Sequence, residues 1–409
     1  MQLHRVETVY LILLIGVMAM SLSNSIAEAE AAILQVSQDG TSDYSRIQDA
    51  VEAAGDGDVI EIGPGRYVDF FDAPYGIRAV IYIDDKSLSF VGAGGGQTVV
   101  GPEVFGQIEG SQVYCAAIIG DGLDCSFEGI QFENVQRYAI YVNSTGRGEI
   151  DNCIFRGSSG GIYAVLGGGG WIRDCEFIDI NTEYQNASIN FYEPTTDMSV
   201  ERCEFRDCYI GVTSSWGGCE NIEIADCVFA NGDLGVSFQD GASGVVFGCQ
   251  FTGQSRYALA GVRPGSFVVE GNTIDVSGGD AYCLCAWDGP GDYTLHGNTM
   301  IGDQCLLGIF DPRGEWDCRD NVFTRAGAST FYIRPAMSSP YTGPPLHLDF
   351  SNNWWGTDDP DLVGDWIFDG NDNPDHHFFV DYLPMNGVVS AEGRSWSSVK
   401  GLFDGGGGE

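Results

Sequence analysis

Three side chains in the last third of the sequence have the types that polysaccharide cleavage requires. Asp288, Asp311 and Arg334 follow one another at intervals of 23 residues. A lyase uses a base and a cation that neutralises a substrate carboxylate, whereas a hydrolase uses two carboxylates flanking the scissile bond. These three residues could supply either the lyase groups or the hydrolase groups, and we therefore treat them as catalytic candidates. Aspartate is so frequent here that chance also produces such pairs.

Aromatic side chains form a second group of interest, because sugar rings have an apolar face and polar edges. They fall at alternate, outward positions of short predicted strands, interleaved with amide and hydroxyl side chains. The aromatic binding candidates are Tyr141, Tyr163, Tyr192, Trp287 and Tyr332. Interleaved polar positions are Asn190, Thr213, Ser215, Ser237 and Gln239. Ordinary surface residues that favour β-strands would give the same pattern, so carbohydrate contact and a plain surface both stay open.

An Asp/Asn cluster near the C-terminus has the oxygen ligands that Ca²⁺ prefers. Its weak metal-binding candidates are Asp369, Asp372 and Asp375. The cluster lacks the spacing of an EF-hand loop. Ca²⁺ is thus the one cofactor that the sequence points to.

These residues must be positioned by a repeat. A phrase of the form Asp-Cys-x-Phe or Gly-Asn-x-Ile recurs every 22 to 32 residues, with an apolar strand before it. Its first positions are Cys153, Cys175, Cys203, Cys227, Cys249, Asn272, Asn298, Asn321 and Asn353. Such a period is typical of a solenoid, in which each unit buries its apolar face against its neighbours.

A second strand lies between successive copies of the phrase, and alternation points its apolar residues inward. Two strong strands and a weaker third in each unit predict a parallel β-helix with three sheets. The five repeated cysteines then form a buried ladder of thiols, since parallel side chains in stacked coils do not suit disulfide geometry. The pairs Cys115/Cys125 and Cys305/Cys318 lie off this ladder, where bridges stay open.

The two ends of the chain differ from the repeat. The apolar run at residues 9–20, followed by Ala27-Glu28-Ala29, predicts a secretory signal peptide over residues 1–29. Residues 43–54 have a helical apolar face and predict a cap on the first coil, with Asp43 at the helix start. We expect the β-helix domain to span residues 33–385, and residues 386–409 to form a flexible tail. No segment of the mature chain is apolar enough to span a membrane.

The charge is strongly negative, with 58 acidic and 19 basic residues and a net charge of −39. Nucleic acid is excluded as a partner because the chain has no basic surface to meet phosphates. Polyuronates would be repelled unless a cation bridged them. Solubility or a salty medium explains this composition, and so does cation binding by clustered carboxylates.

The opening run DGTSDYSRIQDAVEAAGDGDVIEIGPGRYVD resembles the start of pectin methylesterases and of many bacterial secreted right-handed β-helix proteins. Residues 351–384 resemble the closing segment of the same secreted proteins. The resemblance implies the pectate-lyase-like (pectin lyase fold) superfamily. The predicted fold class is therefore all-β, a right-handed three-sheet parallel β-helix of roughly 10–13 coils with a short N-terminal capping helix.

The catalytic motifs of related enzyme families are not matched. The paired aspartates and Gly-His-Gly of polygalacturonases are missing, and Asp311-Pro312-Arg313 matches only the first half of the epimerase Asp-Pro-His-Asp motif. Of the pectate lyase Arg-x-Pro-x-x-Arg pattern, Arg334-Pro335 alone is present. Whether the chain is an enzyme stays open.

The leading hypothesis is an exported, monomeric protein that binds polysaccharide on an outward-facing parallel sheet, with cleavage left open. A non-catalytic surface, adhesive or structural solenoid is the alternative, and a Ca²⁺-dependent matrix protein is a third.

Overall fold

The computed structural model describes residues 31–386 apart from 75–76, 107–116, 121, 145, 181–186, 193–194, 216–217, 288, 290, 328–330 and 336–340. The predicted signal peptide lies outside these residues, as does the predicted tail beyond Asn386. No helix within the described ranges is long and apolar enough to cross a membrane.

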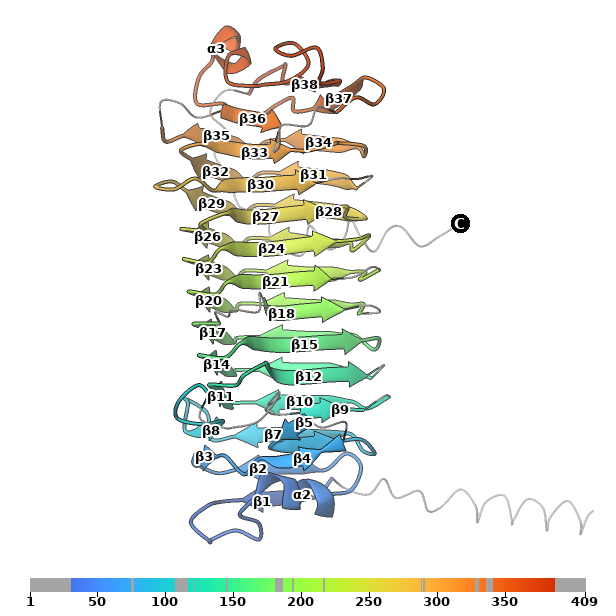
Figure 1. Ribbon diagram of the computed structural model, residues 1–409, viewed down its shortest axis with the longest axis vertical. Helices are drawn as coiled ribbons and strands as arrows, with labels where there is room; N and C mark the ends of the chain where they lie inside the picture. The colour runs from blue at the N-terminus through green and yellow to red at the C-terminus, as the bar shows by residue number, and fades with distance from the viewer. Residues whose placement is uncertain are drawn as a thin grey trace, which may run out of the picture.

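The chain winds into a stack of coils whose strands form three parallel sheets, as Figure 1 shows. Sheet 1 has fourteen strands, and sheets 2 and 3 have eleven each, so the stack has about eleven coils, within the predicted range. Strands of neighbouring coils pair in parallel, as between β12 and β15, and the one antiparallel pair of named strands is the β4–β5 hairpin. These observations confirm the predicted three-sheet parallel β-helix.

The strands of each sheet follow in the order of the stack. Sheet 1 contains β1 (Ile33–Val36), β2 (Val59–Ile62), β7 (Leu88–Gly92), β10 (Cys125–Glu128), β13 (Gly148–Asp151), β16 (Gly170–Arg173), β19 (Met198–Glu201), β22 (Ile222–Ala225), β25 (Gly244–Phe247), β28 (Ser266–Glu270), β31 (Asp292–His296), β34 (Trp316–Arg319), β37 (Leu346–Asp349) and β38 (Phe378–Asp381). Sheet 2 contains β3 (Gly65–Tyr67), β8 (Thr98–Val100), β11 (Gln131–Glu133), β14 (Ile154–Arg156), β17 (Glu176–Ile178), β20 (Glu204–Arg206), β23 (Val228–Ala230), β26 (Gln250–Thr252), β29 (Thr273–Val276), β32 (Thr299–Gly302) and β35 (Val322–Arg325). Sheet 3 contains β6 (Ile81–Ile83), β9 (Ala117–Ile119), β12 (Tyr138–Ser144), β15 (Gly160–Leu166), β18 (Ala187–Tyr192), β21 (Ile210–Ser215), β24 (Leu234–Gln239), β27 (Tyr257–Val262), β30 (Tyr282–Trp287), β33 (Cys305–Ile309) and β36 (Phe331–Pro335). The hairpin joins β4 (Phe71–Ala73) and β5 (Ile77–Ala79).

The repeated phrase is the bend between sheets 1 and 2. The residue before each ladder position has a left-handed backbone, as at Asp174 (φ 52°), Asp226 (φ 53°) and Gly271 (φ 65°). Glycine, asparagine and aspartate adopt this conformation most readily, which explains why they precede the Cys or Asn. The exception is Cys203, where Arg202 has the left-handed backbone (φ 51°). The sharp bend then turns the next side chain into the core.

The ladder side chains bond along the stack. The Cys203 amide N–H donates to Cys227 Sγ at 3.4 Å, and the Cys249 N–H donates to Asn272 Oδ1 at 2.8 Å. Amide-to-amide links continue from Asn272 to Asn298 at 2.9 Å. All twelve cysteines among the described residues are buried free thiols, which confirms the thiol ladder and leaves Cys305 and Cys318 unbridged. Cys115 lies outside the described residues.

A column of phenylalanine rings fills the core beside this ladder. Phe155, Phe177, Phe205, Phe229 and Phe251 stack in successive coils with centroids 4.5–4.8 Å apart. The spacing equals that of neighbouring strands, so one ring position per coil yields a continuous stack. The column fixes the strand register and hence the positions of the outward side chains.

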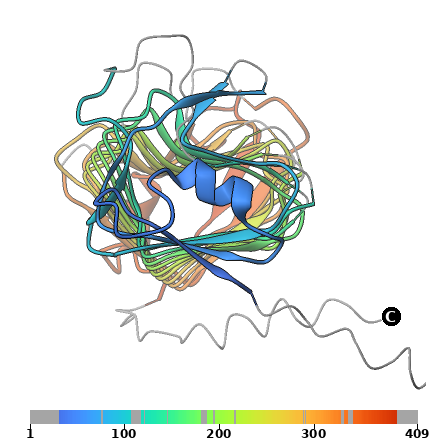
Figure 2. The ribbon, with the colours of Figure 1, turned by 90° about the horizontal axis from the view of Figure 1, so that it is seen from below.

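The first coil is covered by α2 (Ile47–Ala53), which lies across the end of the stack in Figure 2. Its Gln48 side chain bonds the backbone of Tyr82 in both directions, at 2.9 and 3.3 Å. The helix begins after Arg46, so the prediction that Asp43 caps it is wrong. Lys86 binds the other end, donating to the carbonyls of Val51 and Ala54, where a cation favours the helix dipole.

The last coil is closed by the segment that contains α3 (Pro360–Gly364). Its Trp355 is fully buried and contacts Phe323, 4.6 Å between centroids. Ile367 makes an isolated bridge to Ile333 of β36. The closing segment therefore covers the core, as its aromatic residues predicted.

Candidate functional site

Sheet 3 presents the polar and aromatic candidates on its outer face. Ile140, Ile162 and Ile189 point inward and are 0% exposed, so the residues that follow them point outward. The strand register aligns these outward residues across the coils. The central row of the described side chains is Tyr82, Tyr141, Tyr163, Asn190, Thr213, Ser237, Ala260, Cys285, Gly308 and Arg334. The second row is Val165, Tyr192, Ser215, Gln239, Val262, Trp287 and Phe310.

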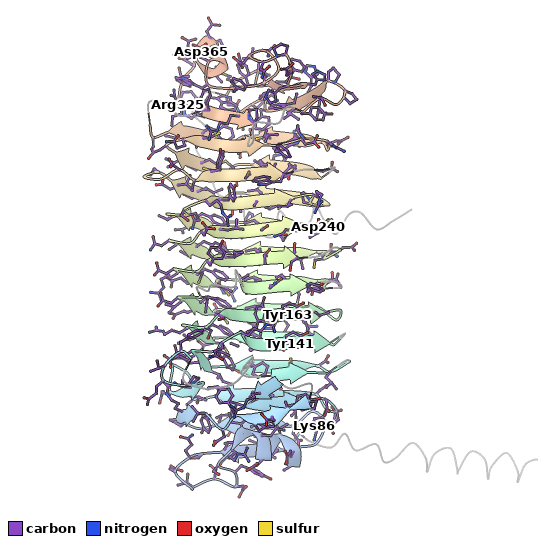
Figure 3. All side chains as sticks on the ribbon, viewed as in Figure 1. Lys86, Tyr141, Tyr163, Asp240, Arg325 and Asp365 are labelled. Atoms are coloured by element: carbon purple, nitrogen blue, oxygen red, sulfur yellow. The ribbon has the colours of Figure 1, made fainter. Side chains whose placement is uncertain are left out.

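A tyrosine cluster occupies the N-terminal part of this face. Tyr141 and Tyr163, both labelled in Figure 3, lie on the neighbouring strands β12 and β15 and stack with centroids 4.9 Å apart and planes 2° apart. Tyr163 also contacts Tyr138 at 5.1 Å and Tyr192 at 5.6 Å. Because the faces of stacked rings contact each other, this cluster offers its edges and hydroxyls to a ligand. The geometry favours hydrogen bonds with sugar hydroxyls over stacking on a sugar ring.

Two phenols of this face, those of Tyr163 and Tyr257, stay protonated at ordinary pH. Burial raises the pKa of Tyr163, and the neighbouring Tyr141 and Tyr192 raise it further. Burial likewise raises the pKa of Tyr257 to about 12. These two hydroxyls therefore act as hydrogen-bond donors and acceptors, and neither is a phenolate base near neutral pH.

A polar segment follows the tyrosine cluster. The Ser215 hydroxyl donates to Asn190 Oδ1 at 2.7 Å, and Asn190 Nδ2 donates to the Tyr138 hydroxyl at 3.3 Å. One coil further, Gln239 Nε2 donates to the hydroxyls of Thr213 and Ser237, both at 3.2 Å. Amide and hydroxyl groups have both donor and acceptor capacity, so such a network suits a ligand with many hydroxyls.

A second aromatic group follows the polar segment. Tyr257 contacts Tyr282 at 5.9 Å and the edge of Trp287 at 6.2 Å, and Trp287 contacts Phe310 at 6.0 Å. Cys285 points outward between these rings, yet it is 0% exposed. The rings cover this part of the sheet, and Trp287 and Phe310 are half-buried at its edge.

Arg334 ends the central row. Its Nη2 donates to the Tyr282 hydroxyl at 2.6 Å, and its guanidinium lies 5.4 Å from the centre of that ring. Burial lowers the pKa of Arg334, but the hydrogen bond to Tyr282 and the interactions with Tyr282 and Cys305 together outweigh it, and the net pKa is raised. A guanidinium held in this way stays charged. It fits the role of a carboxylate-neutralising cation and not that of a base.

The carboxylate candidates follow the second row at the ends of the strands. Asp240, Arg263 and Asp311 occupy one bend position with left-handed backbones, φ 48° to 52°. Asp240 pairs with Arg263 and Asp311 with Arg313, each at 2.5 Å. Asp288 falls at the same position by register but lies outside the described residues. The left-handed bend alone accounts for an aspartate at position 311.

Asp311 also borders a cavity of about 480 Å³ at the C-terminal end of sheet 3. Phe310 and Arg313 line it from one side, and Tyr341 and Pro344 line it from the other. The structure thus places Asp311 and Phe310 next to a space that a small group can enter.

The prediction that Tyr332 faces outward is wrong. Tyr332 is 2% exposed, its ring contacts Trp355 at 5.1 Å, and its hydroxyl donates to the Trp355 carbonyl. Two consecutive residues point into the core where each sheet 3 strand begins, as Leu306 and Leu307 show at 0% exposure. Simple alternation fails at this bend, and Tyr332 belongs to the core.

The predicted metal cluster is a loop held by its own backbone. Asp369 is 3% exposed, and its carboxylate accepts from the amides of Asn371 at 2.8 Å and Val380 at 2.9 Å. Asp372 accepts from the Asp369 amide at 3.2 Å. In the described part of the chain, no three His, Cys, Asp or Glu side chains converge as a metal site. Asp369, Asp372 and Asp375 are therefore not brought together around one ion.

Three outward aromatic residues were not among the sequence candidates. Tyr138, Tyr257 and Tyr282 begin their strands and lie three residues before the central row. A prediction that places outward residues at alternate positions misses these three tyrosines, because the bend at the strand start adds one residue. Their recurrence at the start of sheet 3 strands was the signal available in the sequence.

Comparison with known proteins concerns mainly the fold. Residues 114–300 match the family described as right handed beta helix region. No curated protein matches the sequence. Three solved structures are similar, and the first is PfbA, a surface adhesin of Streptococcus pneumoniae. Its identity is 13%, covering 71% of this chain and 91% of that chain, with a TM-score of 0.48.

The other two are carbohydrate-active by their names. A rhamnogalacturonan lyase is 14% identical, covers 75% of this chain and 86% of its own, and has a TM-score of 0.48. The A-module of the mannuronan C-5 epimerase AlgE4 from Azotobacter vinelandii is 14% identical, covers 70% and 91%, and has a TM-score of 0.43. Identities and TM-scores this low assign no activity to the present chain.

Proposed function

This chain is a right-handed parallel β-helix protein of the pectate-lyase-like fold, and we propose that it binds polysaccharide along the outer face of sheet 3. The ligand runs along the stack, over the tyrosine cluster, the polar segment and the second aromatic group. The predicted signal peptide places this binding outside the cytoplasm, with the protein acting as a monomer.

The polar segment is the observation that carries the proposal. Gln239 bonds two hydroxyl side chains, and Ser215, Asn190 and Tyr138 form a second hydrogen-bonded group beside it. Amide and hydroxyl side chains recur over three successive strands of this face, β18, β21 and β24, each able to exchange hydrogen bonds with a hydroxyl-rich chain. Aromatic groups at both ends add the partly apolar surface that sugar rings contact.

The uncharged middle part of this face points to the class of ligand. From Tyr141 to Gly308, the described members of the central and second rows are all uncharged, on a chain with a net charge of −39. A polyuronate would meet repulsion from the whole molecule, whereas a neutral glycan would not. We therefore propose a neutral, hydroxyl-rich polysaccharide as the ligand.

The test is a binding series with neutral glucans, xylans and galactans and with polyuronates, each with and without Ca²⁺. We expect binding of a neutral polymer that changes little with salt, because no ion pair contributes to it. Binding of polyuronates alone, and only with Ca²⁺, would contradict the choice of ligand. Binding of no glycan would favour the adhesive or structural alternative.

Cleavage is a second candidate function, which the cavity beside Asp311 favours. A bound chain that reaches Phe310 would bring a sugar unit next to this carboxylate. Turnover would then appear as new reducing ends or as the ultraviolet absorbance of an unsaturated product. Asp311→Asn should abolish it while leaving binding at the polar segment unchanged. Unchanged turnover in this variant would exclude Asp311 as the catalytic group.

A further inference from the structure

The outer face of sheet 1 contains a buried apolar patch that the proposed glycan site does not use. The register aligns Glu223, Val245 and Val268 in one row and Ala225, Phe247 and Glu270 in the next. These residues point outward, since Val246 and Val269 between them are 0% exposed and face the core. Yet Ala225, Val245, Phe247 and Glu270 are only 5–7% exposed.

The side chains of the same rows are accessible to solvent in neighbouring coils. Glu149, Trp171 and Ser199 precede Glu223 in the first row, and all three are half-exposed. Thr294 and His296, on the strand after Val268 and Glu270, are half-exposed as well. The sheet itself therefore does not bury an outward side chain. Burial confined to β22, β25 and β28 requires a segment that lies over them.

The chemistry of the patch defines what can cover it. Val245 and Phe247 form a small hydrophobic cluster of their own, with Val268 packed against it. Glu270 is buried at the edge of this cluster and Glu223 borders it, so the apolar patch carries negative charge on its flank. A segment that combines apolar side chains with positive charge is therefore complementary to it.

We propose that residues 387–409 of this chain fold back and dock on this patch. Within them, residues 393–403 (GRSWSSVKGLF) combine Trp396, Val399, Leu402 and Phe403 with Arg394 and Lys400, and contain no acidic residue. Such a segment is unusual in a chain with 58 acidic and only 19 basic residues. Its composition matches an apolar patch bordered by two glutamates.

The segment is long enough to extend from Asn386 to the patch. The Asn386 amide donates to the Asn353 carbonyl at 3.1 Å, which places the start of the segment beside the last coils. From β37 to β25 the chain must pass four strand spacings, about 19 Å at ~4.8 Å each. The ten residues from Asn386 to Trp396 span up to about 33 Å when extended. On this proposal the segment lies on the β-helix surface.

Zero-length carbodiimide coupling of lysine to carboxylate tests the contact on the full chain, because the sequence has only two lysines, Lys86 and Lys400. We expect Lys400 to couple to Glu223 or Glu270 within one molecule. Lys86 lies 3.6 Å from Asp85, so their coupling is the internal positive control. Mixing ¹⁴N and ¹⁵N chains identifies coupling between two copies. Coupling only between copies, or only within residues 387–409, overturns the proposal.

Tryptic cleavage after Arg394 provides a second readout. Val245→Asp and Phe247→Asp each place a charge in the patch without touching the core. We expect trypsin to cleave after Arg394 about tenfold faster in these variants, because the cleavage rate follows the population of the undocked state. Ser199→Asp is the matched control, because it adds the same charge in the same row outside the patch. Equal cleavage rates in all four chains, wild type included, would overturn the docking.

Discussion

From Cys153 to Asn353 the inner bend repeats one chemistry in every coil, whereas the outer face of sheet 3 changes over the same coils. Inside, a thiol or an amide accepts the backbone N–H of the previous coil each time. Outside, tyrosines give way to amides and hydroxyls near Asn190 and then to a second aromatic group at Tyr257. Both regions share one strand register, so the register alone does not explain the difference. Uniform positions maintain the stack, and the positions that vary are those available for a ligand.

Alkaline pH should distinguish the two regions most strongly. Burial raises the pKa of Cys208 to about 11 and also raises those of Cys227, Cys283 and Cys318. The unfolded thiols ionise first, so the stabilisation is complete below about pH 9 and is lost as the pH rises toward 11. At pH 10 each thiol of this kind costs on the order of 1 kcal/mol of unfolding free energy. Urea unfolding at pH 7 and pH 10 under reducing conditions measures this loss.

Glycan binding should not change between pH 7 and pH 9, since the raised pKa values of Tyr163 and Tyr257 keep their hydroxyls protonated. A loss of binding before any loss of fold would contradict the assignment of neutral phenols to the site.

The next largest effect is expected from the amide half of the ladder. Asn298 is 0% exposed; its Oδ1 accepts from the Asn272 amide, and its Nδ2 donates to the Val269 carbonyl, both at 2.9 Å. Asn298→Ala leaves these buried backbone groups without partners, and we expect a loss of about 3 kcal/mol. The urea midpoint of the variant provides the measurement.

The thiol half should tolerate truncation better. Cys227 Sγ accepts from the Cys203 amide at a longer distance, 3.4 Å, and thiols form weak hydrogen bonds. Cys227→Ala should therefore cost about 1 kcal/mol, mainly through a small cavity. An equal or larger loss than that of Asn298→Ala in the same urea assay would show that the two halves of the ladder are not distinguished by their hydrogen bonds.

The interior could be predicted from the sequence because its pattern is local. The Asp, Asn or Gly before nearly every ladder position reflects a left-handed bend at one residue, and the apolar residue two positions after the ladder, most often phenylalanine, fills one core position. Counting the phrase therefore predicts the coils, the thiol ladder and the register. Its physical cause, the positive φ at residues such as Asp174, appears only in the structure.

The outer face was less predictable because it depends on bends and on distant segments. Alternation would point Tyr332 outward, but the bend at the start of its strand turns it into the core, where it contacts Trp355. Tyr257 and Tyr282 precede the central row by three residues and escape a two-residue pattern. The buried patch around Phe247 has no signal in its own strand, since what buries it lies elsewhere in the chain. Burial by a segment that is distant in the sequence produces no periodic pattern in the strand that it covers.

Calorimetric titration of the wild-type chain and three variants with the best-bound neutral polysaccharide tests the central claim most directly. Gln239→Ala and Tyr163→Ala remove groups from the outer face of sheet 3. Trp171→Ala removes an equally half-buried aromatic residue from sheet 1, held between Arg147 and Arg173 at 4.8 Å. We expect the two sheet 3 variants to bind about tenfold more weakly, the loss of one or two hydrogen bonds. Trp171→Ala should bind as the wild type does. Unchanged affinity in both sheet 3 variants, or a loss confined to Trp171→Ala, would contradict a glycan site on sheet 3.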